Sequence, residues 1–360
     1  MINVTRSVMP SLEKYEEKIE KLWETRWLTN NGSYLQELEQ KLSERFGTNC
    51  VVVSNGTLAL LIAVELFEFP KGSEIIVTPF TFAATVEAII WQGYVPVFAD
   101  IDPETFNISP SEIEEKITEK TVAVMPVHVF GNPCEVERIE EIAKKHNLKV
   151  IYDAAHCFDV YYKGNSIYKY GDVSIASFHA TKVFHTIEGG AIMSDNSELI
   201  RKAKRLRNFG FDENINIVEA GINAKMNEFQ AVMGLLNLEI VDEDIAKRKM
   251  VFEKYKHLLS EARVEFQKIN PFTTKYNYIY MPVLFETEQV RDLVFEELKV
   301  AGYNTRKYFY PSLNKVFSNQ SCPNSENIAS PILHLPLYGD LEGEHVENVC
   351  NIIMKIAGVK

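Results

Sequence analysis

The sequence predicts an α/β protein, with a mainly parallel sheet covered by helices and a smaller α+β unit after it. From Cys50 onward, short apolar runs alternate with helical segments, and the runs are apolar on both faces, which is typical of strands in a covered parallel sheet. Near residue 240 a long helical pattern begins and the alternation stops. We therefore expect a large domain over residues 1–240 and a small C-terminal domain over 241–360.

The first 46 residues are expected to form two amphipathic helices separated by a turn. Ser11 suits the N-cap of the first helix. Its apolar face repeats at three- and four-residue spacing through Leu12, Tyr15, Ile19 and Leu22. Residues 28–32 break the pattern, and a second helical pattern then runs to Gly47, which suits a C-terminal cap.

The middle of the chain contains the expected strands of the sheet. They lie at residues 51–53, 75–77, 95–98, 122–127, 150–152 and 173–178. Helical stretches lie between them, for example over 58–67 and 132–146. Ligands of such sheets collect at the carboxyl ends of the strands. After residue 240 we expect a strand at 278–284, a helix at 289–301, a loop rich in Pro, Asn and Ser at 311–331, and a last helix.

Composition excludes several classes of protein. The formal net charge of -12 argues against a nucleic-acid partner, because neutralising phosphates needs a surplus of Lys and Arg. The first ten residues lack the apolar core of a signal peptide, and the longest apolar stretch, 58–67, is too short to cross a bilayer. Five scattered cysteines with no CxxC pair indicate reduced thiols in the cytoplasm.

Ser54-Asn55-Gly56-Thr57 follows an expected strand and opens an expected helix. The N–H groups and partial positive charge of a helix N-terminus suit a phosphate, and an ordinary helix cap is the alternative interpretation. Asp153 follows another strand. A carboxylate after a buried run needs a cation, which a protonated pyridine nitrogen or a metal would supply. With His156 it could form half of a metal site, but no second acidic or His cluster supports one, and we expect no metal.

Lys182 ends the segment Ser177-Phe178-His179-Ala180-Thr181-Lys182, just past a strand. A lysine there can become a Schiff-base nucleophile, and a solvated surface lysine is the alternative. Residues 188–191 (Glu-Gly-Gly-Ala) give a turn before another short strand, and residues 221–226 form a polar loop before a helix over 227–238. No GxGxxG after a strand, GxxxxGK[ST] or GxSxG motif occurs, which disfavours nicotinamide oxidoreductases, P-loop enzymes and α/β-hydrolases.

In this order, the segments resemble the DegT/StrS-type family of sugar aminotransferases. The resemblance runs from Trp27 to the region of Leu335-Pro336-Leu337, and its most specific parts are residues 153–156, 177–182 and 188–190. It implies the three-layer fold type I of pyridoxal-phosphate-dependent transferases, with pyridoxal 5'-phosphate as the cofactor. Some members have His at the lysine position and dehydrate sugars, so Lys182 implies transamination.

The resemblance also implies roles for single residues. Lys182 binds the cofactor covalently and then moves the proton, Asp153 pairs with the ring nitrogen, and His156 lies near the ring hydroxyl. Phe82 stacks on the ring. The phosphate contacts are implied for Gly56, Thr57, Ser177 and, from the neighbouring subunit of a homodimer, Asn223.

For the substrates, the resemblance implies L-glutamate as the amino donor and a nucleotide-linked keto-sugar as the acceptor. Residues 29–32, 126–131 and 306–310 are most similar to enzymes that make dTDP-4-amino-4,6-dideoxyglucose, for surface polysaccharide such as O-antigen. Candidate sugar or diphosphate contacts are His185, Lys225, Arg306 and Tyr308, with surface or packing roles as the alternative. A 3-keto substrate and a catalytically silent cofactor-binding regulator stay open as other functions.

Overall fold

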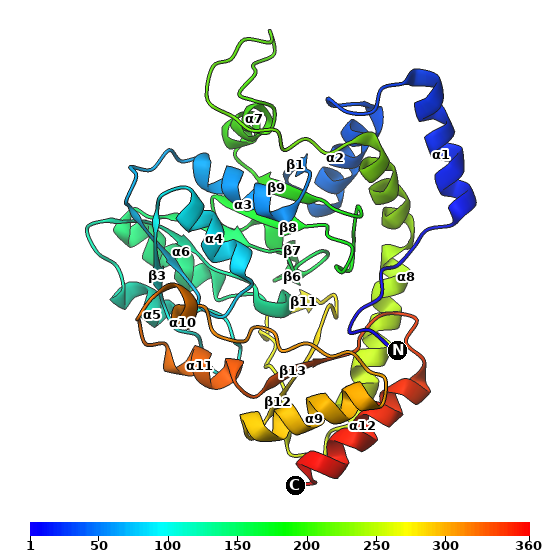
Figure 1. The fold of residues 1–360 in the computed structure, drawn as a ribbon. Coiled ribbons are helices and arrows are strands. Elements are labelled where there is room, and N and C mark those ends of the chain that lie inside the picture. Colours follow the sequence, from blue (N-terminus) through cyan, green and yellow to red (C-terminus); the bar gives the residue numbers. More distant parts are fainter.

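The computed structural model describes residues 1–360 and has a seven-stranded central sheet (Figure 1). Its strand order is β1-β9-β8-β5-β4-β2-β3. β9 is antiparallel to both neighbours, whereas all other adjacent pairs are parallel, so the prediction of a mainly parallel sheet is confirmed. The strands are β1 (Asn49–Val53), β2 (Glu74–Val77), β3 (Val95–Phe98), β4 (Thr121–Met125), β5 (Lys149–Asp153), β8 (Val173–Ser177) and β9 (Gly190–Ser194).

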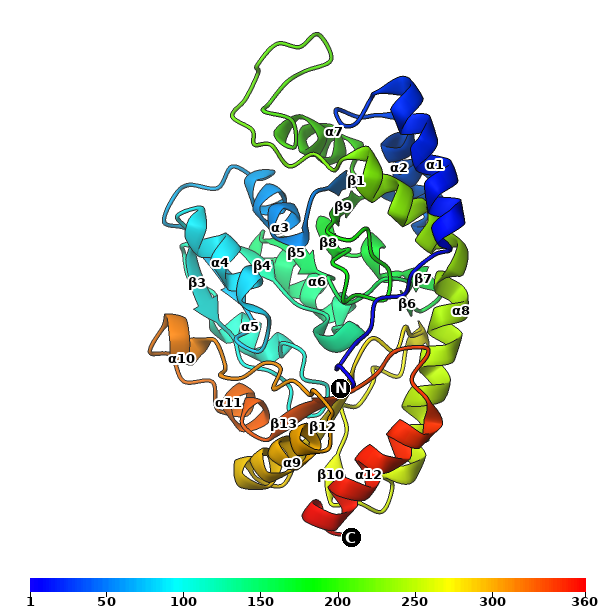
Figure 2. The same cartoon turned by 45° about the vertical axis from the view of Figure 1, so that its right-hand side comes forward.

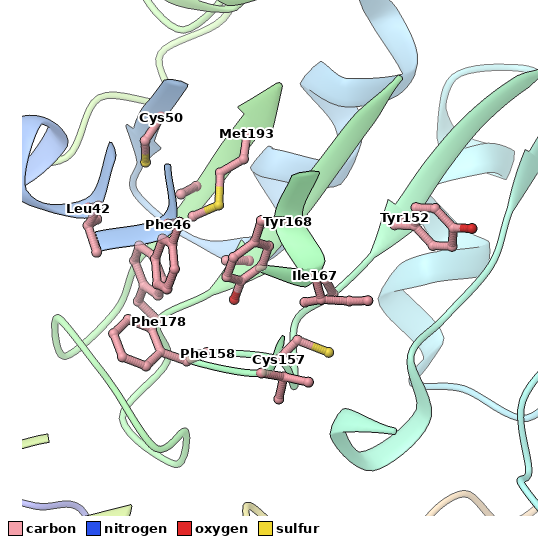
Figure 3. Packing of buried hydrophobic residues seen from close by; sticks show 14 of the residues in the cluster. Leu42, Phe46, Cys50, Tyr152, Cys157, Phe158, Ile167, Tyr168, Phe178 and Met193 are labelled. Atoms are coloured by element: carbon pink, nitrogen blue, oxygen red, sulfur yellow. The ribbon is translucent and has the colours of Figure 1, made fainter. Parts of the chain in front are cut away.

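Helices cover both faces of this sheet and make the predicted three layers (Figure 2). Successive residues of one strand belong to different cores: Val52 packs with α2, α6 and α8, whereas Val51 and Val53 pack with α3, α4 and α7. Figure 3 shows the first core, where Phe46 of α2 meets Phe158 and Tyr168 edge-on. The bounds are α2 (Ser33–Phe46), α3 (Gly56–Glu65), α4 (Ala83–Trp91), α6 (Val136–His146), α7 (Ser197–Leu206) and α8 (Glu228–Leu258).

Short elements complete this part of the chain. Ser11 caps α1 as predicted, because its Oγ accepts the Lys14 N–H at 3.2 Å, and Gly47 ends α2 at φ 63°. A second, three-stranded sheet in the order β11-β6-β7 has no counterpart in the sequence prediction. The remaining bounds are α1 (Leu12–Thr25), α5 (Pro110–Glu115), η1 (Val129–Gly131), β6 (Tyr161–Tyr162), β7 (Asn165–Ser166), η2 (Ile167–Lys169) and β11 (Thr273–Lys275).

The C-terminal part has its own core beside one end of α8 (Figure 1). An antiparallel sheet in the order β10-β12-β13 packs with α9 and α12. Residue 240 lies inside α8, a single 31-residue helix where the sequence indicated two patterns, so the domain boundary stays a prediction. The bounds are β10 (Val264–Glu265), β12 (Met281–Phe285), α9 (Glu288–Val300), β13 (Ile332–Leu335) and α12 (Gly343–Ala357).

The expectation of a loop over residues 311–331 is wrong, because α10 (Asn314–Phe317) and α11 (Pro323–Ala329) lie within it. Asp100 satisfies the N-terminus of α11: its carboxylate accepts the N–H groups of Asn324 at 2.8 Å and Ser325 at 2.9 Å. Because this cap comes from more than 220 residues away, no local capping residue indicates the helix.

All five cysteines are buried, and none forms a disulfide. No helix combines the length and the apolar character that a bilayer crossing requires.

Candidate active site

A cavity of about 270 Å³ lies at the carboxyl ends of β5 and β8. The structure brings eight of the predicted site residues to its lining: Gly56, Thr57, Phe82, Asp153, His156, Ser177, Lys182 and Tyr308. They come from five separate segments of the chain. Placement at the strand ends agrees with the rule for ligand sites in α/β sheets.

Gly56 begins α3, and Ser177 ends β8 directly beside it. A Cβ at Gly56 would lie 3.0 Å from the Ser177 Cβ, so only glycine allows this approach without displacement. Asn55 caps the helix by accepting the Leu58 N–H at 2.9 Å, and Thr57 is exposed at the first turn. The first backbone N–H groups of α3 and the hydroxyls of Thr57 and Ser177 form a donor set suited to a phosphate.

Asp153 is the acidic group at the floor of the cavity, and 5% of it is exposed. Its two oxygens accept hydrogen bonds from the Thr85 hydroxyl at 2.7 Å and the Ala155 N–H at 3.0 Å. Burial raises the pKa of Asp153, although these hydrogen bonds and the nearby Lys182 charge favour the carboxylate. No Lys or Arg forms an ion pair with it, so a cationic ligand would supply the missing counter-charge.

His156 is buried and neutral. Burial lowers its pKa well below the ordinary value, with Lys182 and His334 adding to the effect. Its Nδ1 accepts the Phe130 N–H at 3.2 Å, which leaves the ring proton on Nε2. His156 can therefore donate one hydrogen bond to a ligand in the cavity.

Lys182 lies in the loop between β8 and β9 and lines the same cavity. Its Nζ is 3.4 Å from the Tyr280 hydroxyl, and it forms no ion pair. Phe82, at the N-cap of α4, is 58% exposed, so its ring is free to stack on a ligand.

An aromatic wall closes the side of the cavity that faces the C-terminal part. Tyr280, Tyr308 and Phe309 line it, and His334 of β13 packs behind them against the Tyr280 and Tyr308 rings, with centroids at 5.2 and 5.7 Å. Sequence reasoning missed Tyr280, Phe309 and Thr85. No local motif marks Tyr280 or Thr85, and within the 306–310 segment only Arg306 and Tyr308 were named. Tyr280 directly precedes β12, and it meets the 306–310 segment and α4 here only through the tertiary fold.

Four predicted residues do not line this cavity. His185 is 1% exposed and donates from Nε2 to the Val8 carbonyl at 2.6 Å, which is the geometry of a packed histidine. Lys225 donates to the Asn223 Oδ1 at 2.8 Å, and Lys225 lines a separate hollow with Asn30 and Asn31. Arg306 is exposed and adjoins Tyr308.

Arg306 and its neighbour Lys307 differ in whether their charges have a partner within the chain. The Lys307 Nζ forms an ion pair with the Asp292 Oδ1 of α9 at 2.5 Å, so its charge is already matched within the chain. Arg306 is exposed and forms no ion pair. His128, in a segment that also resembled the dTDP-sugar enzymes, is fully buried and stacks on Tyr152 at 4.5 Å.

The residues of the cavity fit pyridoxal phosphate. The buried carboxylate without an ion pair suits the cationic ring nitrogen. The lysine without an ion pair suits the aldehyde, and the helix N-terminus that begins with a glycine suits the phosphate. No group of three or more His, Cys, Asp or Glu side chains is arranged to hold a metal ion. Fold and site together define a lysine-dependent, pyridoxal-phosphate-binding transferase of fold type I.

Comparison with known proteins gives the family. The chain belongs to the DegT/DnrJ/EryC1/StrS aminotransferase family, whose model matches residues 11–354. It is 41% identical to a dTDP-4-amino-4,6-dideoxy-D-glucose transaminase of Shigella dysenteriae over 99% of both chains, and 37% identical to one of Escherichia coli over 98% of both. The predicted family, fold type, cofactor and aminotransferase activity are thereby confirmed.

A solved structure gives the same picture at the level of the fold. The chain is similar to DesI, crystallised in the presence of its TDP-sugar product, with a TM-score of 0.93 and 31% identity. The match covers 99% of this chain and 93% of that one.

Proposed function

We propose that the protein transfers the amino group of L-glutamate to dTDP-4-keto-6-deoxy-D-glucose, giving dTDP-4-amino-4,6-dideoxy-D-glucose and 2-oxoglutarate. The observation that carries the proposal is the cavity in which Lys182 and Asp153 meet an aromatic wall, in a chain 41% identical over its length to a transaminase of that name. The product named for DesI, a TDP-sugar, supports the same substrate class.

Each residue's place in the site determines its role in the reaction. When bound, pyridoxal phosphate supplies a ring that stabilises negative charge on the reacting carbon. Asp153 keeps the ring nitrogen protonated, because a buried carboxylate favours a cation beside it. Lys182 takes the proton from the substrate carbon and returns it, a step in which a positioned base contributes about 10²–10⁴-fold. His156 donates from Nε2 and holds the ring in place.

The sugar nucleotide is held from the wall side. Tyr308 faces the cavity, and Arg306 next to it offers an unpaired guanidinium for the diphosphate. Binding the remote nucleotide also orients the ketone at the reacting centre. We therefore expect nucleotide-linked keto-sugars to react far faster than free ones.

The test follows the two half-reactions separately, with the pyridoxamine form as the start of the second. Arg306→Ala should slow the half-reaction with the sugar nucleotide and leave the half-reaction with glutamate unchanged. Lys315→Ala, which also removes a positive charge close by in the sequence, serves as the control. A faster reaction with the 3-keto isomer would refute the position of the amine, although transamination would stand. If glutamate leaves the visible spectrum unchanged, the protein is the silent regulator instead.

The proposal includes a homodimer in which Asn223 reaches the phosphate of the partner's cofactor. Asn223 and Lys225 lie together but away from the cavity of their own chain, which supports a role at a neighbouring site. Asn223→Ala and Lys182→Ala, each inactive alone, should regain partial activity when refolded together, because one of the two sites then carries neither change. An active monomer by light scattering would contradict this arrangement.

The proposal also places the enzyme in the cytoplasm, in the synthesis of surface polysaccharide such as O-antigen. Five buried thiols without a disulfide support a reducing compartment. Cell fractionation, with the dTDP-sugar product measured in extracts of a strain that lacks the protein, tests both parts.

A further inference from the structure

Residues 2–8, here called the strap, run extended from the C-terminal part to the start of α1 (Figure 2). One end is fixed to the C-terminal part. Ile2 pairs in parallel with Tyr303: its N–H donates to the Gly302 carbonyl at 2.8 Å, and its carbonyl accepts the Asn304 N–H at 2.7 Å. The Val4 carbonyl accepts the Leu337 N–H at 3.0 Å, just after β13.

The other end of the strap holds the lysine loop, residues 178–187 between β8 and β9. Ser7 Oγ donates to the Ala180 carbonyl at 2.6 Å, and Thr5 Oγ1 approaches the Thr181 carbonyl at 3.5 Å. These two carbonyls belong to the residues directly before Lys182. With the bond from His185 to the Val8 carbonyl, the strap makes three contacts to the lysine loop, two before Lys182 in sequence and one after it.

His185 fixes the far side of the lysine loop. Its Nε2–H donates to the Val8 carbonyl at 2.6 Å, and its Nδ1 accepts the Ile187 N–H at 3.2 Å, so both ring nitrogens are used by a neutral ring. The Asn237 amide of α8 donates to the His185 carbonyl at 2.8 Å. His185 therefore joins the strap, the lysine loop and α8, which explains why it is buried away from the cavity.

We propose that Ser7 and His185 are positioning residues for Lys182, and that the strap holds the lysine loop in register with the C-terminal part that carries the aromatic wall. The strap is hydrogen-bonded at one end to Gly302, Asn304 and Leu337 and at the other end to the lysine loop, so it links the lysine loop to the part of the chain that carries the wall. The proposal rests on Lys182 as the cofactor-binding lysine and is independent of which sugar is the substrate.

Amide hydrogen exchange of the cofactor-free, full-length protein tests the structural part. Ser7→Ala should raise exchange across residues 178–187 about fivefold, the factor that corresponds to one neutral hydrogen bond. His185→Leu should raise it more, and His185→Gln, whose amide can replace the Nε2–H donor, should restore part of the protection. Ser11→Ala is the matched control, because Ser11 follows the strap and caps α1 without touching the lysine loop.

Kinetics of the loaded enzyme test the positioning part. In the glutamate half-reaction, Ser7→Ala should lower the limiting rate constant, here called kcat, about fivefold. The glutamate concentration that gives half of this rate should change little, and Ser7→Thr should recover most of the loss in rate. Unchanged exchange in residues 178–187, or an equal rise in Ser11→Ala, would overturn the proposal. So would raised exchange with normal kcat, since the strap would then serve packing alone. Failure of every nucleotide sugar to react would refute the proposed function but leave both readouts intact.

Discussion

The floor and the wall of the cavity are built in different ways. The floor, defined as Gly56, Asp153, Ser177 and Lys182, is polar and lies where strands of the central sheet end. The wall, defined as Tyr280, Tyr308, Phe309 and His334, is aromatic and comes from the C-terminal part of the chain. The comparison teaches that one region fixes the chemistry and the other fixes the shape into which the substrate must fit.

The largest effect is expected at the floor, from Lys182→Ala. Without the amine no covalent bond to the cofactor can form and no base moves the proton, so activity should fall by at least about 10²–10⁴-fold. Absorption spectroscopy should show loss of the visible band of the lysine-bound cofactor, while cofactor still binds non-covalently. A variant with an unchanged spectrum would show that another lysine holds the cofactor.

Asp153→Asn should have the second-largest effect on activity. A neutral amide cannot keep the ring nitrogen protonated, and loss of one partner from a buried charge pair costs about 3–5 kcal/mol, or roughly 10²–10⁴-fold in turnover. Steady-state kinetics at saturating cofactor measure the loss, with circular dichroism as the control for folding. Near-normal turnover would mean that a different residue faces the ring nitrogen.

At the wall, replacing His334 should alter stability as a function of pH. Burial lowers the pKa of His334 to about 3, so the folded protein binds fewer protons than the unfolded chain between there and the ordinary value of 6.5. Its neutral ring therefore adds stability that is present above pH 6.5 and is lost as the pH falls below it. Urea unfolding of the cofactor-free protein measures the free energy of unfolding at pH 7.5 and 5.5. Between these two pH values, that free energy should fall by about 1.4 kcal/mol less in His334→Gln than in the unchanged protein.

The exposed His257 supplies the control for that experiment, as His257→Gln. If the free energy of unfolding fell equally in His334→Gln and in the unchanged protein between pH 7.5 and 5.5, the neutral state of the buried ring would be contradicted.

The smallest effect is expected from Tyr280→Phe, where the wall touches the floor. Its hydroxyl lies 3.4 Å from Lys182 Nζ, a long contact, so its loss should lower kcat about fivefold or less and leave KM for glutamate unchanged. A larger loss than in Asp153→Asn would remove the distinction between chemistry and shape.

The floor could be predicted from sequence because each of its residues stands in a short motif at a strand end. Asp153 and Lys182 follow apolar runs that specify the strands, and the sheet then brings the strand ends together. Of the wall, only Tyr308 was predicted, since Tyr280 and Phe309 meet the floor only through packing between the two parts of the chain. His185 was named as a candidate substrate contact with a packing role as the alternative, and its ring nitrogens are used by Val8 and Ile187, which favours the packing role.

The burial of all five cysteines has a practical consequence for chemical labelling. Burial raises the pKa of every one of these thiols, so little of the reactive thiolate is present in the native protein. Met9, just beyond the strap, is 64% exposed. A Met9→Cys substitution would therefore give a nearly background-free attachment point for a spin label or fluorophore, which would report the movement of this segment during turnover without removal of any native cysteine.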